Sequence, residues 1–131
     1  MASLFPTVSF IGSIVKRLYN ATQNSLRGLA DGFKTEPALR DEAILLAVAV
    51  PLALFVAPGA AWYVSMIGVL VMVLAVEFLN TAIEKLADHV TPEQNMDIRR
   101  IKDFGSTAVF CSLCLAGLIW FTALAVRCGL L

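Results

Sequence analysis

The sequence is poor in charge and lacks the residues that build common soluble enzyme sites. Only 15% of its 131 residues are charged, against about 25% in soluble domains. A single histidine, His89, cannot form a metal site of paired histidines. There is no P-loop, no dinucleotide-binding glycine motif and no motif of the soluble protein kinases. Together with a hydrophobic content of 59%, these absences favour an integral membrane protein.

An excess of positive charge and a redox cysteine pair are also missing. Ten Lys and Arg residues balance ten Asp and Glu residues, so we expect no nucleic-acid partner. Cys111 and Cys114 have C-x-x-C spacing, but they lie in an uncharged apolar stretch, where a reactive thiolate is not expected. We interpret both as packing residues of a membrane helix. We interpret His89 as a solvated loop residue and assign no partner to Cys128.

One long uncharged segment predicts a hairpin of two membrane helices. No residue from 43 to 76 is charged, which is too long for one span of about 20 residues. Pro58-Gly59 interrupts the segment, so we expect a tight turn there. Pro51 lies inside the first of the two helices, where membrane helices tolerate proline. Trp62 and Tyr63 at the start of the second are typical of a membrane interface.

A second uncharged segment, residues 106–126, has the length of one more span. Every Lys and Arg except Arg127 lies before the first span or between the second and third, which predicts a cytoplasmic N-terminus and a C-terminus on the opposite side. The sequence therefore predicts an all-α membrane protein with three transmembrane helices, in a single domain of residues 1–131. The predicted spans are, in chain order, residues 42–57, 60–84 and 106–126.

Residues 8–34 have a helical repeat of apolar residues, with the polar residues largely elsewhere. We expect an amphipathic helix on the cytoplasmic membrane surface, with an ordinary packed helix as the alternative. Basic residues follow rather than precede residues 1–15, so we expect no cleaved signal peptide. Before the third span, Thr91-Pro92-Glu93-Gln94 predicts a helix cap at Thr91 and a short polar helix after it. The apolar positions of the first segment are Ile11, Ile14, Leu18, Ala21, Leu26, Leu29 and Phe33.

The end of the second span carries the polar residues that could perform chemistry. At about 100° per residue, Glu84 and Asp88 return to within about 20° of Glu77, and Asn80 lies about 60° away. Glu77 lies about 25 Å beyond Ala60, just inside a core about 30 Å thick, and Glu84 lies about 10 Å further, at the membrane surface. An intramembrane carboxylate is costly, so a function or a pair with Lys85 or Lys102 must keep it there.

Other charged residues are predicted at the same membrane level. Glu36 precedes Pro37 and should begin the helix that leads through Glu42 into the first span, while Lys102 and Asp103 stand at the start of the third. Carboxylates can hold Mg²⁺ with nucleotide phosphates, and a lysine can offset phosphate charge. These residues suit phosphoryl transfer at a membrane surface. They suit ion binding in a small transporter equally well, and spacing alone does not decide between the two.

Two strings of residues resemble the small prokaryotic diacylglycerol kinases. The first is E-x-L-N-T-A-I-E-x-x-x-D at residues 77–88, and the second is K-D-x-G-S at residues 102–106. The resemblance covers about residues 16–126 and includes E-x-A-x-R-x-E at residues 36–42. It implies a homotrimeric inner-membrane enzyme with a cytoplasmic N-terminus and a periplasmic C-terminus. Such an enzyme transfers the γ-phosphate of MgATP to the hydroxyl of diacylglycerol and forms phosphatidic acid.

The resemblance also implies a role for each matching residue. Glu77 is the general base for the lipid hydroxyl, and Asn80 orients the catalytic site. Glu36 and Glu84 hold the Mg²⁺ bound to ATP. The positions that it places at the nucleotide are Arg17, Asn24, Glu36, Glu84, Glu93, Gln94, Asn95, Lys102 and Asp103. The positions that it places at the lipid are Arg17, Glu77, Ser106 and Trp120.

The sequence departs from the family at two positions and leaves other functions open. Asn24 stands where an aromatic residue is expected near the adenine, and Ala87 replaces the usual Val before Asp88. An undecaprenol kinase of the same fold is the nearest rival. A small transporter subunit is an alternative from another class, although such proteins usually have four spans with the working Glu in the first. We also expect subunits to share each site, because three thin helices can hardly enclose both ATP and a lipid.

Overall fold

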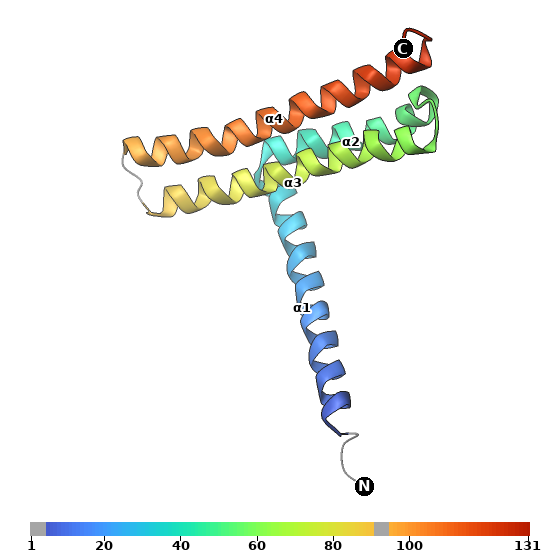
Figure 1. Ribbon diagram of the computed structural model, residues 1–131. Helices are drawn as coiled ribbons and strands as arrows, with labels where there is room; N and C mark the ends of the chain where they lie inside the picture. The colour runs from blue at the N-terminus through green and yellow to red at the C-terminus, as the bar shows by residue number, and fades with distance from the viewer. Residues whose placement is uncertain (1–4, 91–94) are drawn as a thin grey trace. The chain divides into compact units, whose positions relative to one another are not determined.

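A computed structural model describes residues 5–90 and 95–131 of the chain, and this part is helical throughout. Four helices follow one another: α1 (Phe5–Thr35), α2 (Pro37–Val56), α3 (Ala60–Val90) and α4 (Met96–Arg127) (Figure 1). The all-α prediction is therefore confirmed. The chain divides into two units, Met1–Thr35 and Glu36–Leu131, which are described separately below.

The first unit is the single long helix α1. Its apolar residues recur at helical spacing, and large ones such as Phe10, Leu18 and Leu26 are more than half exposed within the chain. Hydroxyl side chains on this helix, among them Thr22 and Ser25, donate to the carbonyl four residues earlier, as in a regular helix. The predicted helix is confirmed, and its position on a membrane surface stays a prediction.

The second unit consists of α2, α3 and α4, of which α3 is the central helix. It lies beside α4 along most of its length and beside the shorter α2 over one half (Figure 1). Between α2 and α3 the chain turns at Pro58-Gly59, and the amide of Ala57 donates to the carbonyl of Ala53 to close the end of α2. Pro51 lies inside α2. The predicted hairpin is thus confirmed.

Small buried side chains let the three helices approach closely near this turn. Ala53 of α2, Met66 of α3 and Ala123 of α4 are fully buried and pack together. Further along, Ala116 of α4 packs against valines of α3. Alanine is typical of membrane-helix interfaces, because without a large side chain the backbones can come near each other. We call this region, from Ala53 to Val73 on α2 and α3 with the facing part of α4, the hairpin end.

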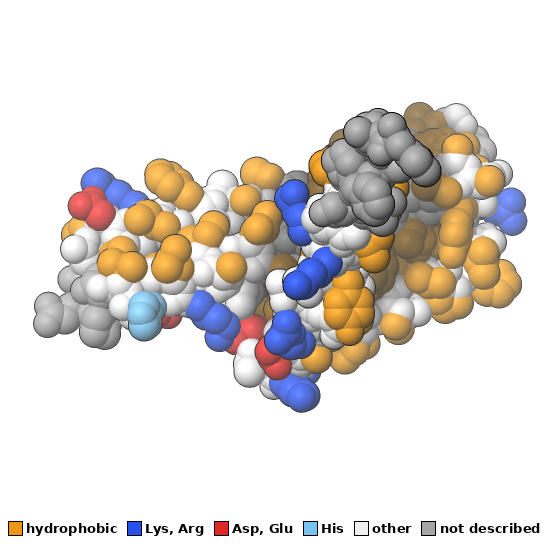
Figure 2. Space-filling view, turned by 90° about the horizontal axis from the view of Figure 1, so that it is seen from below, with side chains coloured by type: hydrophobic (Ala, Val, Ile, Leu, Met, Phe, Trp, Pro, Cys, Tyr) orange, Lys and Arg blue, Asp and Glu red, His pale blue; other side chains and the backbone are white. Residues whose placement is uncertain are grey.

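Two helices of the described residues, α3 and α4, are long and apolar enough to cross a membrane. Only 28% and 17% of their most apolar segments are buried, whereas a core helix of a soluble protein would be mostly buried. Hydrophobic side chains instead cover much of the visible surface (Figure 2), and Phe55 and Phe121 are more than 70% exposed. Such a surface suits lipid or other subunits.

Helix α2 is less clearly a span, for a reason that its sequence makes plain. It has 20 residues, but Arg40, Asp41 and Glu42 occupy its first two turns. The uncharged part that follows is therefore shorter than in α3 or α4. The first of the three predicted spans, residues 42–57 on α2, therefore stays a prediction.

The connection into α4 differs in detail from the prediction. The short polar helix and the third span form one continuous helix, Met96–Arg127. Its N-cap is Asn95, whose Oδ1 accepts from the amides of Asp97 and Ile98 at 2.8 and 3.4 Å. The predicted cap at Thr91, with Pro92, lies outside the described residues.

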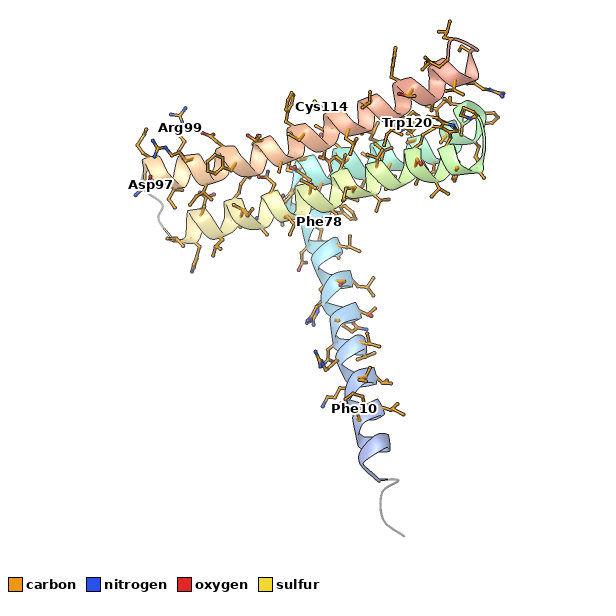
Figure 3. The ribbon with its side chains drawn as sticks, in the orientation of Figure 1. Phe10, Phe78, Asp97, Arg99, Cys114 and Trp120 are labelled. Atoms are coloured by element: carbon orange, nitrogen blue, oxygen red, sulfur yellow. The ribbon has the colours of Figure 1, made fainter. Side chains whose placement is uncertain are left out.

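The helices also bear on two smaller interpretations, those of His89 and of the cysteine pair. His89 is in the last turn of α3 rather than in a loop, although it is exposed as expected. Cys111 and Cys114 lie on the apolar helix α4, as predicted (Cys114 is labelled in Figure 3). Both are exposed within the chain, because the buried residues of α4 are Gly105 and alanines. Their packing role therefore stays a prediction.

Candidate active site

Three of the four polar residues predicted on one face of α3, namely Glu77, Asn80 and Glu84, form a stripe that faces the interior of the unit, whereas Asp88 is exposed. Glu77 and Asn80 are only 8% and 7% exposed, in contrast to their apolar neighbour Leu79, which is 65% exposed. One turn further, Glu84 is half-buried, and its Oε1 accepts a hydrogen bond of 3.2 Å from Nδ2 of Asn80. Buried polar side chains are unfavourable in an apolar environment. These polar side chains therefore occupy the least exposed face of α3, where packing alone would favour hydrophobic side chains.

Asn80 of α3 packs directly against Gly105 of α4. A methyl group on Gly105 of α4 would overlap Oδ1 of Asn80 and would lie 3.4 Å from its Cγ. Gly105 is therefore required by the contact, and not by its backbone angles. Oδ1 of Asn80 is buried and accepts no hydrogen bond from any described residue. A buried acceptor of this kind can receive a hydrogen bond from a bound molecule.

Glu36 is the first residue of the second unit and turns towards α3. It is the N-cap of α2, with an extended backbone (φ −110°, ψ 113°) and Pro37 next to it, as predicted. Its side chain makes no capping hydrogen bond. Instead its Oε1 lies 2.6 Å from Nζ of Lys85, the residue after Glu84. The carboxylate of Glu36 thus reaches the turn of α3 that also carries Glu84.

A second ion pair joins α3 to α4 beyond the stripe. Nζ of Lys102 lies 2.5 Å from Oδ1 of Asp88. The side chain of Lys102 is 34% exposed, and that of Asp88 is 65% exposed. Neither Lys102 nor Lys85 pairs with Glu77 among the residues described. The alternative explanation for Glu77 was an ion pair with one of these two lysines. The structure does not support it, because both lysines pair with other carboxylates.

Glu42 is a carboxylate that the sequence placed in this layer without assigning it to the site. It lies in α2 one and a half turns after Glu36, and its Oε2 is buried without a hydrogen bond to any described residue. It is near enough to Glu77 for the two charges to interact, and Glu77 in turn interacts with Glu84. The sequence feature that could have identified Glu42 is its position directly before the uncharged segment of residues 43–76.

The residues present fit a magnesium ion that is bound together with ATP. No group of three or more His, Cys, Asp or Glu side chains that could hold a metal occurs in residues 5–90 and 95–131. Mg²⁺ needs fewer protein ligands when it carries a nucleotide, because one or two carboxylates then complete a shell of phosphate oxygens and waters. Glu36 and Glu84 are two such carboxylates at one level of α3.

Two residues that the resemblance assigns to the nucleotide lie on α1. Arg17 lines a shallow apolar pocket of that helix with Ile14, Leu18 and Ala21. Asn24 accepts a hydrogen bond of 2.7 Å from Nη2 of Arg27. Both are exposed within their unit. Their roles stay predictions.

The remaining predicted residues are spread along α4 and the segment before it. Glu93 and Gln94 lie outside the described residues, and Asn95 uses its side chain as the cap of α4. Asp103 and Ser106 are exposed, and they lie two residues before and one residue after Gly105. Trp120 lies at the hairpin end, where its Nε1 donates to the carbonyl of Met66 at 3.2 Å (Figure 3). The structure thus places Glu77, Asn80 and Glu84 on one face of α3 and pairs Glu36 with the adjacent Lys85, whereas Trp120 lies away from them.

Comparison with known proteins adds to this geometry. The family model described as prokaryotic diacylglycerol kinase matches residues 23–124. A diacylglycerol kinase of Haemophilus influenzae is 38% identical over 103 residues, which cover 79% of this chain and 87% of that protein. One of Pseudomonas aeruginosa is 36% identical over 110 residues, covering 84% and 89%. One of Escherichia coli K12 is 33% identical over 104 residues, covering 79% and 85%. The chain belongs to the prokaryotic diacylglycerol kinase family.

Proposed function

We propose that this protein is a diacylglycerol kinase of the inner membrane that transfers the γ-phosphate of ATP to the lipid hydroxyl at the cytoplasmic face. Its relatives from Haemophilus influenzae and Pseudomonas aeruginosa are themselves named diacylglycerol kinase, and a kinase of this family implies ATP as co-substrate. The observation that carries the proposal is the stripe on α3, in which buried Glu77 and Asn80 lead to half-buried Glu84. A stripe of this kind suits a reaction between a lipid and a water-soluble nucleotide.

In this proposal Glu77 is the general base. Diacylglycerol has a small headgroup, so its hydroxyl lies near the hydrocarbon boundary, which is the depth expected for Glu77. The Glu77 carboxylate takes the proton of the lipid hydroxyl while the hydroxyl oxygen attacks the γ-phosphorus and ADP leaves. Asn80 holds the Glu84 carboxylate through the 3.2 Å hydrogen bond. It thereby fixes the position of this proposed metal ligand relative to Glu77 on the same helix.

Glu36 and Glu84 are the residues proposed to hold Mg²⁺ bound to ATP. The ion would neutralise the charge of the transferring phosphoryl group. Lys102 and Asp103 at the start of α4 are proposed to contact the nucleotide. The proposal keeps for Arg17, Asn24, Glu93, Gln94 and Asn95 the nucleotide role that the resemblance implies, and for Arg17, Ser106 and Trp120 the lipid role.

The proposal includes three membrane spans in a single catalytic domain of residues 1–131. At 1.5 Å per residue, the 20 residues of α2 extend about 30 Å, the thickness of a bilayer core. Its three charged residues then lie at the cytoplasmic boundary. The excess of Lys and Arg on that side supports a cytoplasmic N-terminus and a periplasmic C-terminus.

We also propose a homotrimer with sites shared between subunits. Large side chains such as Phe55 of α2, Leu79 of α3 and Phe121 of α4 are exposed, and a single chain offers little volume for two substrates. Mixed trimers of Glu77→Gln and Lys102→Ala subunits test the sharing. Recovered activity requires that the two residues come from different chains, and inactive mixtures would place both in one chain.

The function is tested by transfer of labelled phosphate from MgATP in mixed micelles that offer diacylglycerol and undecaprenol side by side. We expect rapid labelling of diacylglycerol by the wild type and almost none by Glu77→Gln. Preference for undecaprenol would make the protein an undecaprenol kinase of the same fold. No transfer to either lipid by folded protein would refute the kinase and favour ion transport, which flux into vesicles would then measure.

A further inference from the structure

The ion pair between Lys85 and Glu36 joins the start of α2 to the turn of α3 that carries Glu84. Lys85 follows Glu84 directly on α3, and its Nζ lies 2.6 Å from Oε1 of Glu36. Two carboxylates that share one metal ion repel each other before the ion binds. An ammonium group on Glu36 offsets part of this repulsion.

The backbone of Glu36 does not by itself direct its side chain towards α3. Short polar side chains at an N-cap position usually accept a hydrogen bond from the second or third amide of their own helix. The longer Glu36 side chain makes no such bond. The direction of this carboxylate is therefore set by contacts with other side chains, of which the pair with Lys85 is one.

The two partners differ in their freedom to move. The Glu36 side chain is 25% exposed, and the Lys85 side chain is 61% exposed. A lysine has three donors on a flexible stem. An ionised carboxylate has about four acceptor sites on its two oxygens, so it can contact Lys85 and a metal ion at the same time. Groups that hold a metal ligand in this way orient it and raise its affinity for the ion.

We propose that Lys85 is a positioning residue that holds the Glu36 carboxylate beside Glu84 for a divalent cation carrying a nucleoside triphosphate. The inference rests on the proposed function. It adds to that function a residue that touches neither substrate and acts through Glu36. Lys102 does not serve this purpose, because its ammonium group is paired with Asp88.

The proposal predicts a defect in metal binding rather than in the chemical step. Loss of a residue that orients a metal ligand commonly lowers metal affinity by about tenfold to a hundredfold. We therefore expect Lys85→Met to raise the half-saturating concentration of the cation and the KM for MgATP by about tenfold. The kcat at saturation should change little. Lys85→Arg keeps the charge and the reach, so it should restore most of the affinity.

The experiment measures binding of Mn²⁺ in the presence of a non-hydrolysable ATP analogue, by electron paramagnetic resonance on full-length protein in micelles. It compares the wild type with Lys85→Met, Lys85→Gln, Lys85→Arg and the control Lys34→Met. Lys34 is an exposed lysine near Glu36 in the chain, and the structure gives it no ion pair among the described residues. Its loss removes the same charge. Steady-state kinetics and thermal unfolding are recorded on the same samples.

Weak Mn²⁺ binding by Lys85→Met and Lys85→Gln, with near-normal binding by Lys85→Arg and Lys34→Met, supports the role. Unchanged Mn²⁺ binding in folded Lys85→Met or Lys85→Gln overturns it. An equal loss in Lys34→Met also overturns it, because the effect would then be one of overall charge. If the wild type itself transfers no phosphate to lipid, the proposed function fails, and the binding data still decide the role of Lys85.

Discussion

The two ends of the α2–α4 unit are built on opposite principles. At the hairpin end, Ala53, Met66 and Ala123 are fully buried and pack without polar groups. At the other end, which we call the charged end and which begins at Glu77, the polar Glu77 and Asn80 are buried together with the apolar Leu39 and Ala87. Carboxylates of α2 and α3 gather there, and lysines pair with two of them. The hairpin end can therefore stabilise the fold, and the charged end can carry out the chemistry.

The difference shows how a small membrane protein can hold costly groups near a bilayer. Glu77 and Asn80 are buried on a helix whose other half packs through small apolar contacts. Those contacts fix the distance between α3 and α4, so that buried polar groups can be tolerated further along the same pair. If this division is correct, substitutions at the charged end should lower the rate, and substitutions at the hairpin end should lower stability.

The largest effect is expected for Glu77→Gln at the charged end. A general base contributes about 10²–10⁴-fold to the rate, so kcat should fall by at least about a hundredfold. Stability should hold or rise, because the amide removes a charge that is costly near the membrane. Phosphate transfer and thermal unfolding in micelles measure the two effects. The control is Asp41→Asn, an exposed acid of α2. If Glu77→Gln lost its activity because the protein unfolded, the separation of a catalytic end from a stabilising end would be contradicted.

Met66→Ala should produce the largest loss of stability at the hairpin end. Truncation of a fully buried methionine commonly costs about 2–5 kcal/mol, and Met66 is 0% exposed. The kcat of the protein that stays folded should be unchanged. Unfolding by SDS titration in micelles measures the free energy. Met72→Ala is the matched control, since Met72 is 59% exposed on the same helix, and equal losses in both variants would contradict a packed core at this end.

Much of the second unit could be predicted from local sequence. Pro58-Gly59 broke a long uncharged segment and located the hairpin. The spacing of Glu77, Asn80 and Glu84 placed them on one face, and the hydrogen bond between Asn80 and Glu84 confirms part of that arrangement. These predictions hold because helical periodicity and turn preferences act over a few residues.

The partners of the charged residues could not be predicted in the same way. Lys85 pairs with Glu36, and Lys102 pairs with Asp88, across different helices. Which lysine reaches which carboxylate depends on the distance between helix axes and on side-chain reach, and neither is encoded in a local pattern. Asn95 caps α4, and this cap was not predicted, because the sequence pattern pointed to Thr91, which lies outside the described residues.

Gly105→Ala tests the close approach of α3 and α4 at the charged end. The added methyl group would overlap Oδ1 of Asn80, and overpacking typically costs about 1–3 kcal/mol. Because Asn80 also bonds Glu84, the kcat should fall with stability. Gly117→Ala is the matched control, since nothing lies within 4 Å of a methyl group there, and it should be neutral or slightly stabilising. Equal behaviour of the two variants would show that the contact does not limit the approach.

The smallest effect is expected for Trp120→Phe, and it decides between two roles for this residue. The indole Nε1 donates to the carbonyl of Met66 at 3.2 Å, and loss of one such bond costs about 1 kcal/mol. If Trp120 belongs to the stabilising end, unfolding in micelles should shift by this amount while the KM for diacylglycerol is unchanged. Trp62→Phe is the control, because its indole makes no hydrogen bond within the described part of the chain. A raised KM with unchanged stability would instead assign Trp120 to the lipid, as the resemblance implies, and would extend the substrate site to the hairpin end.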